Sequence, residues 1–160
     1  MGREYLYETK NFGVCVPKMP HVSREEGGHL YIMFKGRHKC HSRLDFSSSE
    51  AKEFIRLSML VGEAMLLGMK NRGVTIERIN YQENGNWSFL RYEQPVFHMH
   101  LYGRTSDSLQ QRWGEALYFP DPETSFYDHI TPLDHDDVLE ILTQLKKLEY
   151  NAKFAPEKWS

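Results

Sequence analysis

The sequence has few cysteines, no long apolar run and no excess of charge of one sign. Its two cysteines, Cys15 and Cys40, form no Cys-x-x-Cys pair, which favours a reduced, cytoplasmic setting. No apolar run approaches the ~20 residues of a membrane span, and the first residues contain no apolar signal core. The formal net charge of −2 argues against the basic surface of a nucleic-acid-binding protein. We therefore expect neither a membrane nor bulk nucleic acid as a partner.

Internal repeats and low-complexity linkers are absent too. At 160 residues the chain is long enough for one well-cored domain and too short for two. Its 9 Phe, 9 Tyr and 3 Trp supply apolar area to offset the entropy of folding. We predict a single domain over residues 1–160.

The regular elements can be located from local patterns. Aromatic and β-branched runs at 12–16, 30–34 and 74–81 predict strands. Ser47 and Glu50 have capping-box spacing, and the apolar residues after them recur at helical intervals: Phe54, Leu57, Val61, Ala64 and Met65. This pattern predicts a long helix that ends at Gly73.

A second helix is predicted near 134–149. Asp136 and Asp137 suit its positive N-terminal end. Val138, Leu142 and Leu145 would form its buried stripe. Because strands and helices do not alternate as βαβ units, we predict an α+β domain with a mainly antiparallel sheet.

The most informative stretch is the strand-like run from Gln94 to Arg104. Side chains alternate between the faces of a strand, so Val96, His98, His100 and Tyr102 share one face, and Phe97, Met99 and Leu101 the other. The apolar set can pack onto the helices, while two imidazoles and a phenol occupy the opposite side. A solvated face with two incidental histidines is the simpler alternative.

Imidazole suits chemistry at phosphorus near neutral pH. With an ordinary pKa of ~6.5, about three quarters of the population is neutral at pH 7 and has a free nitrogen lone pair. A nucleophile needs a group that orients the ring and donors that stabilise charge on the phosphate oxygens. Asn80, Tyr102 and Arg104 are candidate donors.

Three segments together resemble the histidine-triad family. Gln94 to Tyr102 is similar to its signature, a Gln-x-Val-x stretch leading into His-x-His-x-His. Gly28-His29, then Lys35 and His38, are similar to the family's Gly-His strand and Pro-Lys-x-His segment. Asn80 ends a strand where the family carries an asparagine that touches phosphate. The resemblance is strongest over 12–104, and 105–160 is a C-terminal extension.

The resemblance implies the residue roles. His100 would attack the phosphorus, and His98 would orient the ring of His100. His29 would support the site from the neighbouring strand. Gln94, Asn80, Arg104 and Lys35 would bind the substrate's phosphate. The reaction would be hydrolysis or transfer of a nucleotidyl group from an ester, an anhydride such as a dinucleoside polyphosphate, or a phosphoramidate, through a nucleotidyl-histidine. The resemblance implies no metal and no cofactor. It does imply that the chain forms a homodimer.

One position departs from the family pattern in a way that bears on activity. Tyr102 stands where the third histidine is expected. Its phenol, with a pKa of ~10, is a weaker acid than imidazolium but can donate a hydrogen bond to a phosphate oxygen.

Two other hypotheses remain open from the sequence. A weakly catalytic nucleotide-binding or sensing module would fit the presence of Tyr102. A metal-dependent β-barrel would fit His-x-His on a strand, and His38, Cys40 and His41 also lie close in sequence, although their spacing does not make a typical zinc site.

Overall fold

The computed structural model describes residues 5–90 and 93–159; residues 1–4, 91–92 and 160 of the predicted domain lie outside the described part. Five antiparallel strands form one sheet in the order β1-β2-β3-β5-β4. The strands are β1 (Tyr7–Glu8), β2 (Phe12–Cys15), β3 (His29–Phe34), β4 (Arg78–Gln82) and β5 (His98–Arg104). The α-helices are α1 (Ser48–Asn71), α2 (Asn86–Leu90) and α3 (His135–Leu148), with short 3-10 helices at Arg24–Glu26, Arg43–Asp45, Ser125–His129 and Pro156–Lys158. The predicted α+β class is confirmed.

One face of the sheet, the apolar face, is packed against α1. It consists of alternate residues of four strands: Phe12, Val14, Leu30, Ile32, Phe34, Ile79, Met99 and Leu101. Helix α1 meets it with the periodic residues that the sequence singled out, and all five are buried. Burial of large apolar side chains contributes about 1.5–3 kcal/mol each, so this layer is a major source of stabilisation.

The boundaries of α1 follow from its ends. Ser47 Oγ accepts from the backbone N–H of Glu50, and the Glu50 carboxylate accepts from the backbone N–H of Ser47, so the predicted capping box is present. At the other end Gly73 has a φ of 83°, and the N–H of Val74 donates to the carbonyl of Met69. Because this closing turn uses the Val74 N–H, β4 begins at Arg78, four residues later than predicted. Within the described ranges, no helix is long and apolar enough to cross a bilayer.

Helix α3 packs across α1 at a glycine. A Cβ on Gly68 would lie 2.9–3.0 Å from atoms of Ile141, including its backbone, so only glycine permits this close crossing. The predicted stripe is partly wrong: Ile141 and Leu145 are fully buried, whereas Leu142 is only half-buried. The close crossing places position 141 at the centre of the contact.

The N-terminus of α3 is fixed by a buried carboxylate. Asp137 is fully buried and accepts two hydrogen bonds from Arg24, at 2.6 and 2.8 Å, and one from Arg72 at 3.1 Å. Burial alone would raise the pKa of Asp137, but the hydrogen bonds from Arg24, Asp134 and Arg72 outweigh it and lower the pKa to about 2. This ion-pair cluster joins the end of α1, the start of α3 and the 3-10 helix at Arg24–Glu26.

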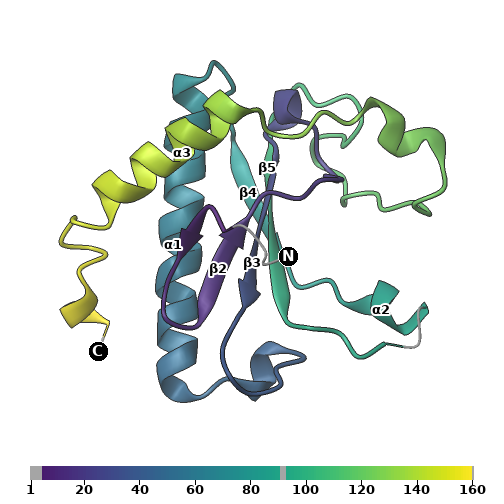
Figure 1. Cartoon of the computed structure of the whole chain (residues 1–160). Helices are drawn as coiled ribbons and strands as arrows, with labels where there is room; N and C mark the ends of the chain where they lie inside the picture. Colours follow the sequence, from purple (N-terminus) through teal and green to yellow (C-terminus); the bar gives the residue numbers. More distant parts are fainter. Residues whose placement is uncertain (1–4, 91–92, 160) are drawn as a thin grey trace.

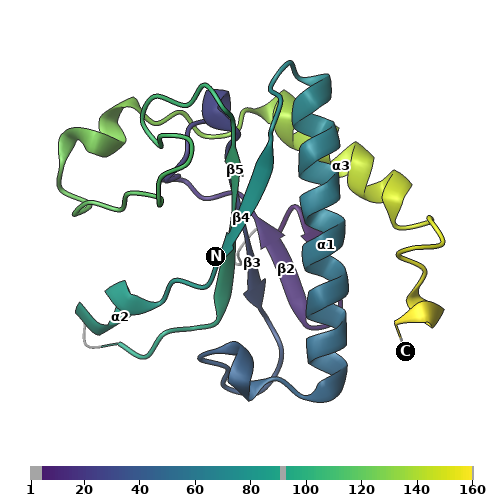
Figure 2. The same cartoon turned by 180° about the vertical axis from the view of Figure 1, so that it is seen from behind.

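The other side of the sheet, the histidine face, carries His29, Tyr31, His98, His100 and Tyr102. Figures 1 and 2 show α1 and α3 on one side of the sheet, while the α2 segment and the segment after β5 extend from the opposite side. The α2 segment and the segment after β5 start near opposite ends of the histidine face. They form the outer walls of the cavity that is described in the next section.

Candidate active site

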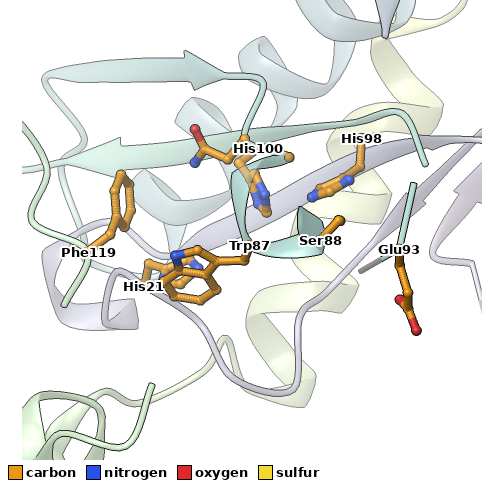
Figure 3. A pocket seen from close by; sticks show the side chains of 9 residues that line it. His21, Trp87, Ser88, Glu93, His98, His100 and Phe119 are labelled. Atoms are coloured by element: carbon orange, nitrogen blue, oxygen red, sulfur yellow. The ribbon is translucent and has the colours of Figure 1, made fainter. Parts of the chain in front are cut away.

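Strand β5 presents two imidazoles to a cavity. His98 and His100 line a cavity of about 410 Å³, while Phe97, Met99 and Leu101 are at most 3% exposed on the other side of the strand. The predicted alternation of β5 is therefore confirmed. Figure 3 shows the two rings projecting side by side toward the cavity.

The ring that contacts His100 most directly is His29. On the neighbouring strand β3, His29 lies opposite Tyr102 and diagonal to His100, and its Nε2 is 2.7 Å from His100 Nδ1. The backbone N–H of His21 in turn donates to His29 Nδ1 at 3.2 Å. A continuous hydrogen-bonded series thus runs from His21 through His29 to His100.

The nearest hydrogen-bond partner of His98 is the backbone. Its Nδ1 donates to the carbonyl oxygen of Val96 at 2.8 Å, and its ring stands edge-on to His100 with 4.8 Å between centroids. The strand register explains the difference, because neighbours two apart on one strand meet ring to ring, whereas His29 reaches His100 from the adjacent strand. His29 is therefore the imidazole that is hydrogen-bonded to the ring of His100.

Burial keeps the inner histidines neutral. Desolvation, with smaller contributions from the charges of His98 and His21, lowers the pKa of His100 to about 3. Desolvation lowers the pKa of His21 to about 4 and that of His29 well below its ordinary value. At pH 7 all three rings are neutral, so each has one nitrogen that accepts and one that donates.

The wall opposite β5 is aromatic and includes residues that the sequence did not single out. His21 lies between Trp87 of α2 and Phe119, with ring centroids 5.5 and 5.1 Å away. Figure 3 shows Trp87 beside His21 and below His100. His21 Nδ1 is buried and, within residues 5–90 and 93–159, has no hydrogen-bond partner. Neither His21 nor Phe119 belongs to a periodic segment, so no local signal marks them.

Two buried side chains hold this wall in place. The Glu26 carboxylate accepts from the backbone N–H groups of Leu109, Gln110 and Gln111 at 2.7, 2.8 and 3.0 Å. The Gln111 amide donates to the carbonyls of His21 and Tyr118 and accepts from the N–H of Tyr118. The segment that carries Phe119 is thereby tied to the segment that carries His21.

Arg104 and Asn80, both predicted to bind phosphate, bind each other. Arg104 is 4% exposed, and its guanidinium donates to Asn80 Oδ1 and to the carbonyls of Gln111, Arg112 and Glu115. Burial in the strand end, with carbonyls converging on it, explains why this cation stabilises the 111–115 turn. In this structure Arg104 does not face the cavity.

Tyr102 is also inside the protein. It is 0% exposed, its ring stacks on His100 at 5.4 Å with 9° between planes, and its hydroxyl accepts from Asn84 Nδ2 at 3.1 Å. Burial raises the pKa of the phenol far above its ordinary value. Asn84 lines the cavity, so the phenol is hydrogen-bonded to a residue of the cavity wall.

The two remaining predicted phosphate-binding residues lie apart from the cavity. Lys35 forms an ion pair with Glu8 at 3.1 Å beyond the end of β3. Gln94 is exposed before β5 and is not among the residues lining either cavity described here.

A second, smaller cavity of about 190 Å³ adjoins the first. His98, Asn84 and Gly85 border both cavities. The smaller one is completed by polar and apolar residues of the loops before α1 and around α2: His41, Ser42, Glu83, Phe89, Pro95 and Val96. His98 is the imidazole shared by the two.

The β-barrel expected by the metal hypothesis is not the fold of this chain, because the sheet is open and one face is covered by helices. Throughout the described residues, no group of three or more His, Cys, Asp or Glu side chains is arranged to hold a metal ion. His38, Cys40 and His41 instead contact Glu50, the Ser42 carbonyl and the Pro95 carbonyl.

The antiparallel sheet, the long helix on one face and the imidazoles on the other define a histidine-triad fold. Three solved structures support this assignment, each with a TM-score of 0.55. A hypothetical histidine triad nucleotide-binding protein from Sulfolobus tokodaii is 17% identical and is matched over 94% of this chain and 89% of its own. A Hit-like protein involved in cell-cycle regulation from Bartonella henselae is 15% identical, over 90% and 87% of the two chains. A Zn-bound histidine triad family protein from Mycobacterium smegmatis is 17% identical, over 91% and 85%.

Neither a protein-family model nor a curated protein matches the sequence. At identities of 15–17% the structural likeness establishes the fold.

Proposed function

We propose that this chain is a nucleotidyl hydrolase or transferase that forms a covalent nucleotidyl-histidine on β5. The observation that carries the proposal is a cavity with two imidazoles on one wall and aromatic rings on the other. Its volume of about 410 Å³ suits a small-molecule ligand, since such sites commonly span ~300–1,000 Å³. A solved neighbour described as nucleotide-binding is consistent with this class of ligand.

The aromatic wall is suited to a nucleobase. Trp87 is 37% exposed, so its indole face is accessible for stacking, and Phe119 borders the same cavity. With the base against these rings, the phosphate would lie at the imidazoles of His98 and His100. Ser88 and Asn84 also line the cavity and take the donor role that the sequence assigned to Arg104 and Lys35.

The chemistry requires a neutral imidazole, and the site provides it. A ring nitrogen attacks phosphorus, the bond to the leaving group breaks, and water or another acceptor then releases the nucleotidyl group. The resemblance implied His100 as the nucleophile. Because the nucleophile is nitrogen, we expect turnover in buffer without added metal.

The test is a panel of adenylylated and guanylylated esters, anhydrides and phosphoramidates. We expect turnover of at least one compound and, after rapid quenching, an intact mass increased by one nucleotidyl group. The variant with both His98 and His100 replaced by Ala should show neither. Prolonged chelation should leave both signals in place, whereas loss of turnover that zinc restores would contradict a metal-independent reaction.

A nucleotide-binding or sensing module without turnover is the second candidate. It is favoured by Tyr102, which is buried at the third triad position and leaves no imidazolium there to protonate a leaving group. Calorimetric binding of nucleotides with no product and no adduct would support this candidate over the first.

The resemblance also implies a homodimer, and we propose one through α1. Its outer side carries an apolar stripe of Ile55, Met59 and Leu66, which are 46, 38 and 37% exposed. Sedimentation should give twice the chain mass, and Ile55→Glu together with Met59→Glu should reduce it to the monomer. A wild-type monomer at tens of micromolar would contradict the dimer.

We also propose a cytoplasmic setting. Cys15 and Cys40 are both buried and are not disulfide-bonded to each other. Two buried thiols suit a reducing compartment. Fractionation of cells that produce the full chain tests this.

A further inference from the structure

We infer that His21 contacts the nucleobase as a hydrogen-bond donor, and that the site therefore prefers nucleotides of guanine and hypoxanthine to those of adenine. The inference rests on the proposed nucleotide site and names the class of base that the site selects. It depends on the place of His21 in the larger cavity and on which nitrogen of its ring bears the proton.

The larger cavity has an aromatic end, where His21 lies. The ring centroids of Trp87 and Phe119 are 5.5 and 5.1 Å from that of His21. Figure 3 shows these three rings together, with His98 and Glu93 toward the other end of the cavity. A nucleotide with its phosphate at the imidazoles of β5 would have its base at the aromatic end. His21 supplies a polar ring edge there, among side chains that otherwise offer apolar contact.

The position of His21 is fixed through its backbone and its ring. The N–H of His21 donates to His29 Nδ1 at 3.2 Å, and the carbonyl accepts from Gln111 Nε2 at 2.9 Å. Tyr127 also packs edge-on against the imidazole, with 5.5 Å between centroids and 68° between planes. A side chain that is already held in place loses little entropy when a ligand binds, so its geometry can discriminate between ligands.

The proton of the His21 ring is assigned to Nε2. Among the residues that the structure describes, the buried Nδ1 has no hydrogen-bond partner. A buried N–H without an acceptor is the rarer arrangement in proteins, so the proton occupies the other nitrogen. Burial lowers the pKa of His21 to about 4, so the ring bears only that one proton at pH 7. Because Nδ1 is enclosed, Nε2 is the nitrogen that a ligand in the cavity can contact, and this nitrogen donates.

A donor at this position distinguishes purines by their exocyclic groups. Guanine and hypoxanthine carry an oxygen that accepts a hydrogen bond, where adenine carries an amino group that donates. With adenine in the same orientation, the amino group and Nε2–H of His21 would face each other as two donors, and neither would recover the bond that it makes in water. A site that hydrogen-bonds its ligand rejects an analogue without the matching group more strongly than apolar contact alone does.

The first test compares ligands on the wild-type protein by calorimetry. The ligands are guanosine monophosphate, adenosine monophosphate, the monophosphate of 2-aminopurine riboside, whose base is guanine without the oxygen, and ribose 5-phosphate, which has no base. Guanosine monophosphate should bind about ten- to a hundredfold more tightly than the adenine and 2-aminopurine nucleotides. Equal affinities for these three nucleotides overturn the inference, and the proposed function stands if turnover is still observed. If no nucleotide binds and no adduct forms, the proposed function fails and the base preference fails with it.

The second test compares two variants of the chain. His21→Phe keeps an aromatic ring and removes the donor, so it should bind the guanine and adenine nucleotides with similar affinity and leave the affinity for ribose 5-phosphate unchanged. The matched control is His129→Phe, because His129 is exposed and does not border either cavity described here; it should keep the preference. Two outcomes overturn the inference when circular dichroism shows an intact fold: a guanine preference that persists in His21→Phe, or an equal loss of affinity for ribose 5-phosphate, which would mean that His21 only supports the cavity.

A third measurement requires neither a ligand nor a variant. Nitrogen-15 spectra of the imidazoles in the free wild-type protein distinguish a proton on Nδ1 from one on Nε2. We expect Nε2–H for His21 at pH 7, and a proton on Nδ1 overturns the inference.

Discussion

The two faces of the sheet are built in different ways. The apolar face is covered by α1 and α3, whose buried residues recur at helical spacing and whose contacts are numerous and similar. The histidine face is covered by segments with little regular structure, held by single polar groups such as Glu26 and Gln111. On the apolar face, many neighbouring contacts remain when one contact is lost. On the histidine face, the loss of one polar contact removes the main attachment of a whole segment.

This difference separates stability from ligand binding. Changes on the helical side should lower the free energy of unfolding and leave the site intact until the protein unfolds. Changes at the anchors of the histidine face should weaken nucleotide binding more than they lower stability.

Asp137→Asn should be the most destabilising of these changes. It removes the buried charge that Arg24 and Arg72 share and leaves the two partly buried guanidinium groups with only longer contacts, of 3.5–3.8 Å, to more exposed carboxylates. We expect a loss of about 3 kcal/mol in the free energy of unfolding by denaturant titration. The matched control is Asp136→Asn, because Asp136 is exposed and its contact with Arg72 is long, at 3.8 Å. This change should lower the free energy of unfolding by less than about 0.5 kcal/mol. Equal effects would show that the ion-pair cluster contributes little.

The pH dependence of stability should distinguish the two regions. His21 and His100 have folded-state pKa values of about 4 and about 3, below the ordinary 6.5, so the unfolded chain binds their protons first as pH falls. Their contribution is present above pH 6.5 and declines below it, by about 1.4 kcal/mol per pH unit for each histidine that stays neutral. Asp137, with a pKa lowered from 3.8 to about 2, loses its contribution only below about pH 4.

Unfolding titrations at pH 7, 5.5 and 4.5 measure the histidine contribution. His21→Asn should reduce the slope between pH 6.5 and 4.5 by about one proton, while Asp137→Asn should leave that slope unchanged. A flat wild-type profile above pH 4.5 would contradict neutral buried histidines in the native state.

Glu26→Gln should affect binding more than folding. The new amide group would face one of the three backbone N–H groups that the carboxylate now accepts, and the Phe119 segment loses part of its anchor. We expect about 1–2 kcal/mol of destabilisation, with nucleotide affinity reduced at least tenfold. Glu25→Gln, at the exposed adjacent position, is the control and should change neither by much. Unchanged affinity in Glu26→Gln would show that the segment is held by other contacts.

Patterns along the sequence predicted the helical side of the fold well. The capping box of Ser47, the helical spacing after it and the alternation of β5 are local signals, and each is present in the structure. Of the candidate site residues, His29, His98 and His100 lie on strands, and the structure brings these three rings together.

The remaining site residues depend on contacts between distant segments. His21 is placed by Gln111, 90 residues later, and Arg104 is turned from the cavity by carbonyls of a loop with no periodic pattern. The hydrogen bond between His29 and His100 depends on strand register, which sets His29 opposite Tyr102. No local pattern contains that information.

Tyr102→Phe should have the smallest effect. The sequence assigned the phenol as a donor to phosphate, and that role would give a ten- to a hundredfold loss of turnover when the hydroxyl is removed. In the structure the ring is buried against His29 and His100, and the hydroxyl holds Asn84. Phenylalanine keeps the ring packing and removes one neutral hydrogen bond, worth about 1 kcal/mol. We expect nucleotide affinity to fall about fivefold, and we expect the same fivefold reduction for substrates with different leaving groups.

Asn84→Ala should reproduce this effect, and the double variant should add little to either single change, because both remove the same bond. Additive losses in the cycle, or a defect in Tyr102→Phe that grows with leaving-group basicity, would mean that the phenol acts on the substrate itself.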